Sequence, residues 1–315
     1  MVRRFLPLLV LLALGCAPSR APGKLEPPPG PTRVLRLATW NLHDLFDEVD
    51  DPYSDEVPRP AEVERKLEAL ARALRSLDAD LVAVQEVEKG SLLEALARRA
   101  GYREVVLHEG NDTIRGIDVG LMARVPLEGW ATHLADDLPA LSGVPPGARF
   151  SRDCLEVHVA VPGGLVLLVN HLKSQAFGGR RGDLLRQAQA GRVRQIVEGL
   201  GSTPAAVLGD LNAAPRSASL APLLDGTLVD VLAEASFEER VTFPDPQRRS
   251  ILDYILVNRA LAPRVVPGSA RVVRGRAFEA ASDHLPVVVD LQMPAPEGLQ
   301  GPEGAPSPAR EAPGR

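Results

Sequence analysis

Short apolar runs, separated by turn residues and by helical stretches, constrain the fold of this chain more than any other feature. Runs of this length that are rich in Val, Leu and Ile predict β-strands. Ala61–Leu77 instead carries apolar residues at helical spacing directly after Pro60, which predicts a helix, as do Ser91–Arg99 and Asp183–Leu200. The predicted strands are Val34–Trp40, Leu81–Gln85, Val119–Ala123, Leu155–Val161, Leu165–Asn170, Ala205–Leu208, Ile251–Val257 and Pro286–Leu291.

Two of these predicted strands decide the kind of sheet. Leu155–Val161 and Leu165–Asn170 are joined only by ProGlyGly, which predicts a hairpin of antiparallel strands. A purely parallel sheet is therefore excluded. A mixed sheet with helices on its outside predicts a layered α/β sandwich.

The chain begins with a segment typical of export signals. Two arginines precede the apolar run Phe5–Leu14, and the small residues Gly15 and Cys16 follow at a cleavage point. The run is too short to span a membrane. AlaLeuGlyCys at 13–16 resembles a bacterial lipobox, with Ala13 where Leu is usual, and predicts a lipid anchor on Cys16. The alternative is a plain signal peptide, so we expect either a cell-envelope lipoprotein or a secreted or periplasmic protein.

One large domain is predicted between two segments that have nothing to bury. After the signal at 1–16, residues 17–32 are rich in Pro and Gly and predict an extended linker, and residues 294–315 predict a disordered tail. Residues 33–293 have a length typical of one domain. If Cys16 is acylated, Cys154 has no partner for a disulfide, so the domain must rely on its core.

The charge of the chain limits its partners. It has 36 Lys and Arg against 41 Asp and Glu, a net charge of −5, which argues against coating nucleic acid by bulk electrostatic attraction. A local basic rim around one cleft is compatible with this total, and so is ordinary solvated surface. The arginines that would form such a rim are Arg115, Arg180, Arg181, Arg248 and Arg249, and GlyGlyArgArgGlyAsp at 178–183 is the predicted substrate loop.

Polar residues interrupt or follow several predicted strands. Asn41 and Glu86 each end an apolar run, and an amide with a carboxylate can hold a hard divalent cation. In ValLeuGlyAspLeuAsn, Gly209 allows close backbone approach, and Asp210 and Asn212 lie two residues apart, on one face of an extended chain. Such a pair can position an attacking water. Taken alone, Asn41 is better explained as a turn or cap residue and Glu86 as a solvated strand end. The Asp210–Asn212 pair alone is equally explained as an Asx turn that closes the strand.

SerAspHis at 282–284 is the strongest signal. His284 lies at the entrance of a buried strand, where an imidazole can hold a phosphate or protonate a leaving group. Asp253 interrupts the apolar run IleLeuAspTyrIleLeu, and a charge is costly to bury there unless it is paired, so it is the predicted partner of His284. His171, in LeuValAsnHisLeuLysSer, repeats the pattern of a strand followed by a histidine. A lone histidine is more often structural, but the combination predicts one polar centre.

The order of these motifs resembles the endonuclease/exonuclease/phosphatase superfamily, which has the deoxyribonuclease-I-like fold. The motifs are AlaThrTrpAsn, GlnGlu, AsnHisLeuLysSer, GlyAspLeuAsn, AspTyr and SerAspHis, and they span residues 34 to 292. AsnAspThrIleArgGlyIleAspValGly at 111–120 and HisLeuLysSerGln at 171–175 are most similar to bacterial secreted nuclease-type members. The resemblance implies a four-layer sandwich, in which two packed, mostly antiparallel β-sheets are flanked by helices.

The resemblance also implies roles for individual residues. Arg152 resembles the arginine that grips a phosphate oxygen. The positions that match catalytic residues are His171, Asp210, Asn212, Asp253 and His284. The positions that match the metal site are Asn41, Glu86 and Asp283, for Mg²⁺ or alternatively Mn²⁺ or Ca²⁺.

We therefore expect an exported, metal-dependent phosphodiesterase, most simply an endonuclease that hydrolyses DNA or RNA by attack of water on phosphorus. One alternative is a phosphatase or lipid phosphodiesterase of the same fold. Low aromatic content, at 4%, and the lack of a visible insertion loop make a lipid substrate less favoured. The other alternative is a surface binding module without turnover. No protein partner is inferred.

Overall fold

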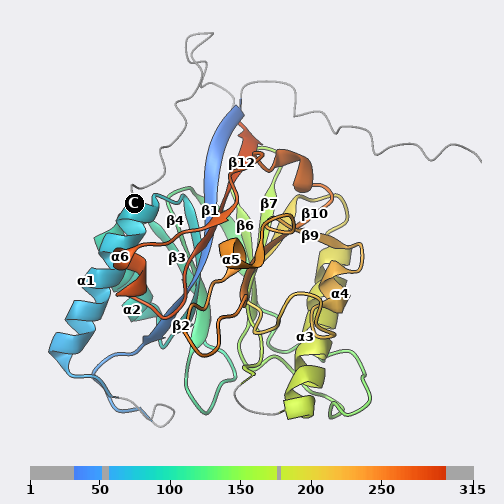
Figure 1. Ribbon diagram of the computed structural model, residues 1–315, viewed down its shortest axis with the longest axis horizontal. Coiled ribbons are helices and arrows are strands. Elements are labelled where there is room, and N and C mark those ends of the chain that lie inside the picture. Colours follow the sequence, from blue (N-terminus) through green and yellow to red (C-terminus); the bar gives the residue numbers. More distant parts are fainter. Residues whose placement is uncertain (1–31, 52–56, 176–178, 296–315) are drawn as a thin grey trace, which may run out of the picture.

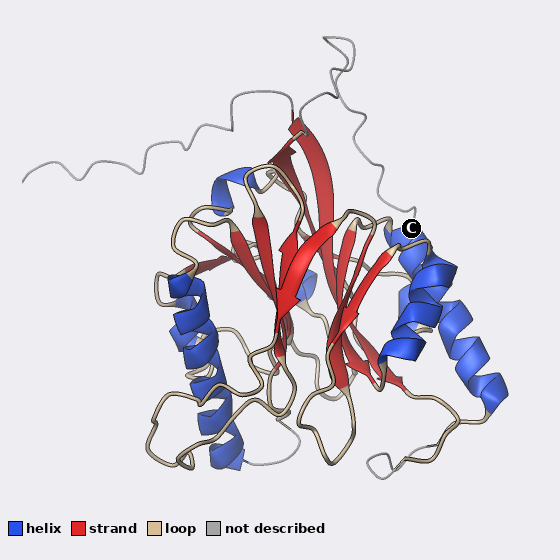
Figure 2. Cartoon of the chain, turned by 180° about the vertical axis from the view of Figure 1, so that it is seen from behind, coloured by secondary structure: helices blue, strands red, loops and turns tan. Residues whose placement is uncertain are grey.

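The computed structural model describes residues 32–51, 57–175 and 179–295. Two six-stranded sheets pack face to face, and the long helices cover their outer faces (Figure 2). Helices α1 and α2 lie on one outer side and α3 with α4 on the other (Figure 1). The predicted layered sandwich, with two sheets between helical layers, is confirmed.

The first sheet has the strand order β11-β12-β1-β2-β4-β3. Its strands β1 and β2 run parallel, and the remaining neighbours run antiparallel. The bounds are β1 Thr32–Leu45, β2 Leu81–Val87, β3 Glu104–Leu107, β4 Asp118–Ala123, β11 Arg271–Val272 and β12 Val287–Pro294.

The second sheet has the order β5-β6-β7-β8-β10-β9. It again contains one parallel pair, β7 with β8, and its other neighbours are antiparallel, including the predicted β6–β7 hairpin. The bounds are β5 Leu127–Ala131, β6 Cys154–Val159, β7 Leu165–His171, β8 Ala205–Asp210, β9 Leu228–Asp230 and β10 Asp253–Asn258.

The helices follow from apolar periodicity and from their end residues. Helix α1 begins at Pro60, whose missing N–H costs nothing in the first turn. It ends at Leu77 and is followed by its C-cap residue Asp78, which has the left-handed conformation. Its buried side chains recur at helical spacing along the face that covers the first sheet. The bounds are α1 Pro60–Leu77, α2 Gly90–Ala100, α3 Gly179–Gly199, α4 Ala221–Leu224, α5 Phe237–Arg240 and α6 Arg276–Glu279, with a 3₁₀ turn η1 at Ala262–Arg264.

Two apolar clusters form the core. The larger one fills the space between the sheets and continues under α1 and α2, and the smaller one packs between the second sheet and α3. Cys154 is fully buried in the smaller cluster, as expected for a small apolar residue. These two clusters hold both sheets rigidly around the polar residues at one end of the sandwich.

Each predicted strand and helix corresponds to an observed element. The strands that the sequence did not predict are β3, β5, β9 and β11, all of which lie at or next to a sheet edge and are short. Thr32 and Pro294 pair across β1 and β12, so both are strand residues rather than linker and tail. The signal segment with Cys16, and most of the linker and tail, lie outside the described residues. No helix in the described part of the chain is both long and apolar enough to cross a membrane.

Candidate active site

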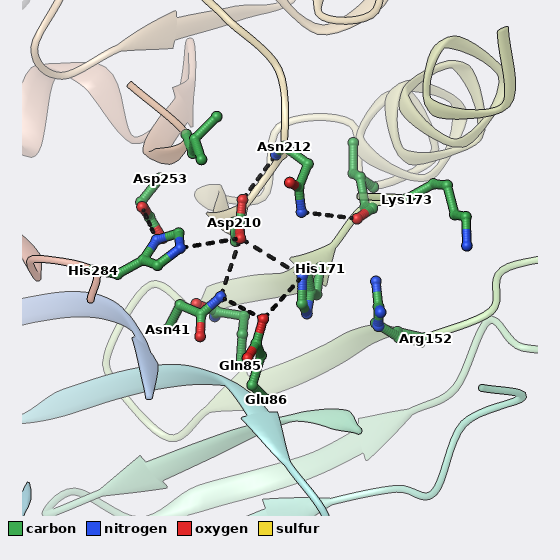
Figure 3. A network of polar contacts seen from close by, with 12 residues as sticks. Asn41, Gln85, Glu86, Arg152, His171, Lys173, Asp210, Asn212, Asp253 and His284 are labelled. Atoms are coloured by element: carbon green, nitrogen blue, oxygen red, sulfur yellow. Dashed lines mark hydrogen bonds and ion pairs between the residues drawn. The ribbon is translucent and has the colours of Figure 1, made fainter. Parts of the chain in front are cut away.

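The candidate site lies at one end of the sandwich, between the two sheets (Figure 3). Asp210, the last residue of β8, is in register with His171 on β7 and with Asp253 on β10. Side chains alternate between the two faces of a strand. Leu208 and Ile255, two residues from Asp210 and Asp253, belong to the core between the sheets. All three polar side chains therefore point toward the first sheet.

The first sheet supplies Glu86 and Asn41 to the site. The Asn41 Nδ2 atom donates to Glu86 Oε1 and to Asp210 Oδ2, both at 3.1 Å, so it joins the two sheets. Glu86 interrupts the β2–β4 register and has a φ of 62°, a costly conformation for a residue with a side chain. Burial raises the pKa of Glu86, but the facing His171 ring and hydrogen bonds from the Asp44 amide and Asn41 lower it overall, so it is a carboxylate at neutral pH.

Gly209 and Asp210 form the strand end that the sequence singled out. A Cβ at Gly209 would lie 1.9 Å from the Asn170 carbonyl oxygen, which confirms that close approach requires glycine here. Asn212 does not share an extended face with Asp210, because β8 ends at Asp210 and Asn212 has a φ of 48°. Instead Asp210 Oδ1 accepts the Asn212 backbone N–H at 2.9 Å, and the Asn212 amide donates to the Leu172 carbonyl at 3.2 Å.

His284 and Asp253 form a buried pair. His284 Nδ1 lies 2.8 Å from Asp253 Oδ2, and both side chains are under a tenth exposed. Burial alone would lower the pKa of His284, but the adjacent Asp253 carboxylate and the hydrogen bond to it raise that pKa to about 10. At neutral pH His284 is therefore an imidazolium ion. Its Nε2 faces Asp210 Oδ2 at 3.9 Å, and the Phe243 ring lies 5.1 Å from its ring.

His171 and Arg152 line the opposite side of the site. His171 Nε2 lies 3.6 Å from Asp210 and 3.9 Å from Glu86, and burial together with the Arg152 charge lowers the pKa of His171 well below its usual value. Arg152 is 4% exposed and is held by Asp112 at 3.0 Å. Its Nε and Nη1 atoms have no hydrogen-bond partner among the described residues. These donors can bind an anion such as a phosphate oxygen.

A cavity of about 220 Å³ opens between these side chains. It is lined by the half-buried Glu86 and the buried Arg152, His171, Asp210, Asn212 and His284, and by Arg115 and Arg248 at its rim. Arg249 instead pairs with Glu238, away from the cavity lining, while Arg180 and Arg181 are exposed on the first turn of α3. The predicted substrate loop at 178–183 is described only from residue 179 onward.

Asp283 is placed differently from the other predicted site residues. Its side chain is 41% exposed and lies 3.4 Å from His43 Nδ1, at the mouth of the site rather than among the cavity-lining residues. Its assignment to the metal site stays a prediction. Phe243 and the turn residues His43 and Asp44 belong to the site but were not predicted, because neither a strand end nor a motif with recognised chemistry marked them.

The buried carboxylates fit a bound cation. Burial and the neighbouring Asp253 carboxylate raise the pKa of Asp210 to about 7, so its negative charge is poorly compensated in this structure. Atoms of Asp210, Asp253 and His284 lie within 4.8 Å of one another, but a cation among them would compete with the His284–Asp253 hydrogen bond. Glu86 and Asp210 offer oxygen atoms on either side of the Asn41 amide, and hard divalent cations prefer oxygen ligands. The Glu86–Asp210 side therefore fits a metal ion better.

Comparison with known proteins assigns this two-sheet α/β sandwich, with its carboxylates and histidines at one end, to a family. Residues 38–284 match the model of the endonuclease/exonuclease/phosphatase family. The match covers most of the chain, and the chain belongs to this family. Its members are phosphoric-ester hydrolases that are generally metal-dependent. A search of curated proteins finds no match.

Solved structures agree on the fold. TDP2 from D. rerio, in complex with a single-strand DNA product, superposes with a TM-score of 0.60 at 19% identity over 82% of this chain and 98% of that one. The human nocturnin catalytic domain with bound sulfate gives 0.56 at 18% identity over 82% and 96%. A family protein from Leptotrichia buccalis gives 0.56 at 16% identity over 82% and 99%. At these identities the likeness establishes the fold alone.

Proposed function

We propose that the protein is a metal-dependent phosphodiesterase that hydrolyses DNA or RNA, most simply as an endonuclease. The observation that carries this proposal is the buried His284–Asp253 pair, which faces Asp210 across one cavity with the unpaired donors of Arg152. Hydrolysis of a phosphodiester requires compensation of the phosphate charge, an activated water and stabilisation of the leaving oxygen. The chain supplies a group for each requirement.

The residues around the cavity have separate roles in this proposal. Arg152 binds a non-bridging phosphate oxygen through Nε and Nη1, the donors that have no hydrogen-bond partner in the described part of the chain. Asp210 accepts the proton of the attacking water, since a carboxylate with a pKa of about 7 suits a general base near neutral pH. His284, held as an imidazolium by Asp253, stabilises negative charge that develops on the phosphate or the leaving oxygen.

The same arrangement supports a divalent metal ion, for which we propose Mg²⁺. Glu86 would hold the ion through its carboxylate, with Asn41 orienting Glu86 and Asp210 toward each other. When bound, the ion would compensate phosphate charge and favour the ionised form of Asp210. Mn²⁺ and Ca²⁺ also accept oxygen ligands and are included in the test below.

Nucleic acid is the proposed substrate class. Arg248, and Arg115 beside its ion-pair partner Asp44, place guanidinium groups at the rim of an otherwise acidic protein, as expected where a polyanion enters. The likeness to TDP2 bound to single-strand DNA product supports the same class. We further propose that the protein is exported, on the basis of the signal-like segment at 1–16 and the cysteine at its end.

A substrate panel tests the proposal. Plasmid DNA, single-strand RNA, a phospholipid and a phosphate monoester are incubated with the protein and Mg²⁺, Mn²⁺, Ca²⁺ or a chelator. We expect metal-dependent cleavage of nucleic acid, with hydrolysis of lipid or monoester alone assigning the protein to the alternative activities. Asp210→Ala and His284→Ala should each lower kcat by on the order of a hundredfold or more while thermal unfolding stays cooperative.

Matched substitutions outside the site are the controls. Asp225 is exposed at the end of α4, and the His158 side chain is 41% exposed on β6. Asp225→Ala and His158→Ala should therefore retain activity. Undiminished cleavage by Asp210→Ala or His284→Ala, or full activity in excess chelator, contradicts the proposed roles.

A further inference from the structure

A single lysine joins two backbone segments whose contacted residues lie 238 residues apart in the chain and which meet at the site. Lys66, on helix α1, donates from Nζ to the His43 carbonyl oxygen at 2.8 Å and to the Ala281 carbonyl oxygen at 2.9 Å. The first carbonyl belongs to the end of β1, and the second to the loop before β12. Lys66 does not line the cavity itself.

Each joined segment carries a part of the site. Asn41, two residues before His43, donates hydrogen bonds to both Glu86 and Asp210. His284, three residues after Ala281, is hydrogen-bonded to Asp253. The distance between the metal side and the imidazolium side of the cavity therefore depends on how these two segments are fixed to each other.

The segments are also fixed by contacts that Lys66 borders. Ser282 Oγ donates to the Asn41 carbonyl oxygen at 2.7 Å and accepts the His284 backbone N–H at 3.1 Å. Trp40 Nε1 donates to the His284 carbonyl oxygen at 2.9 Å. Lys66 contacts His43 and Ala281, which lie next to these contacts on the two segments. It therefore adds a further link between the segments, from the side of α1.

The β1 segment needs such support because its backbone is strained. His43 and Asp44 both have a φ of 53°, the left-handed region, which costs about 1–2 kcal/mol for each residue with a side chain. Asn41 Oδ1 accepts the His43 N–H and Glu86 Oε2 accepts the Asp44 N–H, so the turn is held on one side by the site residues themselves. Lys66 holds the same turn from the other side, through the His43 carbonyl.

We propose that Lys66 is a positioning residue, which fixes the strained end of β1 at His43 and Asp44 to the loop before β12 that carries His284, and so sets the spacing between the Glu86–Asn41 side and the His284 side of the site. The proposal rests on the phosphodiesterase function proposed above for its kinetic consequence. Its geometric consequence, the placement of His284, is independent of any substrate. An ångström-scale misplacement in an active site lowers the rate by roughly a hundredfold.

The test compares Lys66→Met with Lys66→Arg and Lys89→Met. Methionine keeps the length of the side chain but donates no hydrogen bond, whereas arginine keeps both charge and donors. Lys89 is a matched control, because it also contacts two acceptors, Asp47 at 2.7 Å and Glu88 at 3.5 Å, but joins no segment that carries His284.

We expect Lys66→Met to lower kcat between tenfold and a hundredfold, with KM changed less than threefold. Lys66→Arg should recover a large part of this loss, and Lys89→Met should match the wild type. The second readout is the low-field NMR signal of the His284 Nδ1 proton, assigned by its loss in His284→Gln. It should shift or broaden in Lys66→Met and stay unchanged in Lys89→Met.

Three results overturn the proposal. The first is an unchanged His284 signal with unchanged kcat in Lys66→Met, and the second is an equal loss of kcat in Lys66→Met and Lys89→Met. The third is a loss of kcat that arginine does not rescue and that a matching fall in Tm explains. If the wild-type protein hydrolyses nothing in the substrate panel, the proposed function fails, and the NMR signal still decides the positioning role on its own.

Discussion

Substitution of Asp253 by asparagine removes one charge from the site and keeps its shape. Asp253 and His284 are joined by a 2.8 Å hydrogen bond at a position where their side chains are 0% and 7% exposed. The Asp253 carboxylate, with smaller contributions from Asp210 and Asp283, raises the pKa of His284 from 6.5 to about 10 against the opposing effect of burial. At about 1.4 kcal/mol for each tenfold change in the proton equilibrium, the site as a whole favours the imidazolium form by ~5 kcal/mol, with Asp253 as the largest favourable contribution.

Asparagine can still accept the hydrogen bond but supplies no negative charge, so the pKa of His284 falls, because burial is then opposed only by the Asp210 and Asp283 carboxylates. The pairing contributes stability that is fully present below the unfolded-state pKa of about 6.5 and is lost as pH rises through about 10. In Asp253→Asn this contribution is absent, and the neutral fraction of His284 at pH 7.5 rises. We expect kcat at this pH to fall by up to on the order of a hundredfold, with recovery toward lower pH.

The assay is kcat between pH 5 and 10 on the best substrate of the panel, together with an NMR titration of the His284 ring. The wild type should lose the imidazolium only near pH 10, whereas Asp253→Asn should lose it at a clearly lower pH. Asp225→Asn is the control, because that carboxylate is exposed at the end of α4 and does not line the cavity. An Asp253→Asn variant with wild-type kcat, or one whose His284 still titrates near 10, refutes this account.

Two further predictions concern the stability of the scaffold. Gly209→Ala should destabilise the protein by ~3 kcal/mol or more, or prevent folding, because the added Cβ would lie 1.9 Å from the Asn170 carbonyl oxygen. A chemical denaturation curve with the wild-type midpoint would contradict this prediction. His133 lies 2.8 Å from Asp136 and 3.0 Å from Glu156, and although burial lowers its pKa, these carboxylates raise it overall. Its contribution is present below about pH 6.5 and lost as pH rises through the raised pKa, so His133→Gln should lower Tm more at pH 5.5 than at pH 9, and an equal loss at both argues against it.

The sequence indicated which side chains lie together at one end of the sandwich where each stands next to a long buried strand. Asn41, His171 and Asp210 all follow apolar runs, and the period of two along a strand fixes the face on which they lie. Lys66 could not be predicted in this way, because its helical segment reads as an ordinary charged surface and its acceptors are backbone carbonyls 23 and 215 residues away. Asp283 shows the opposite case, since its motif was recognised but its side chain lies at the mouth of the site.

The short strands were missed for a related reason. Strand β11 has two residues and β9 three, too few to show a period of two, and they exist because longer neighbours offer free edges. Strand β5 alternates weakly and is largely exposed. Local pattern predicts strands that bury both faces, whereas the pairing of short edge strands depends on tertiary contacts that a single sequence does not encode locally.

The topology explains why residues so far apart in the chain meet at one end of the sandwich. Each sheet contains a parallel pair, β1 with β2 and β7 with β8, whose carboxyl ends lie at the same edge. Antiparallel strands beside each pair, β12 and β10, begin at that edge. Asn41 and Glu86 therefore come from two strand ends and Asp253 from a strand start. Because Glu86 belongs to one sheet and Asp210 to the other, a cation held between them requires both sheets to be packed, so metal affinity depends on the same core that gives the domain its stability.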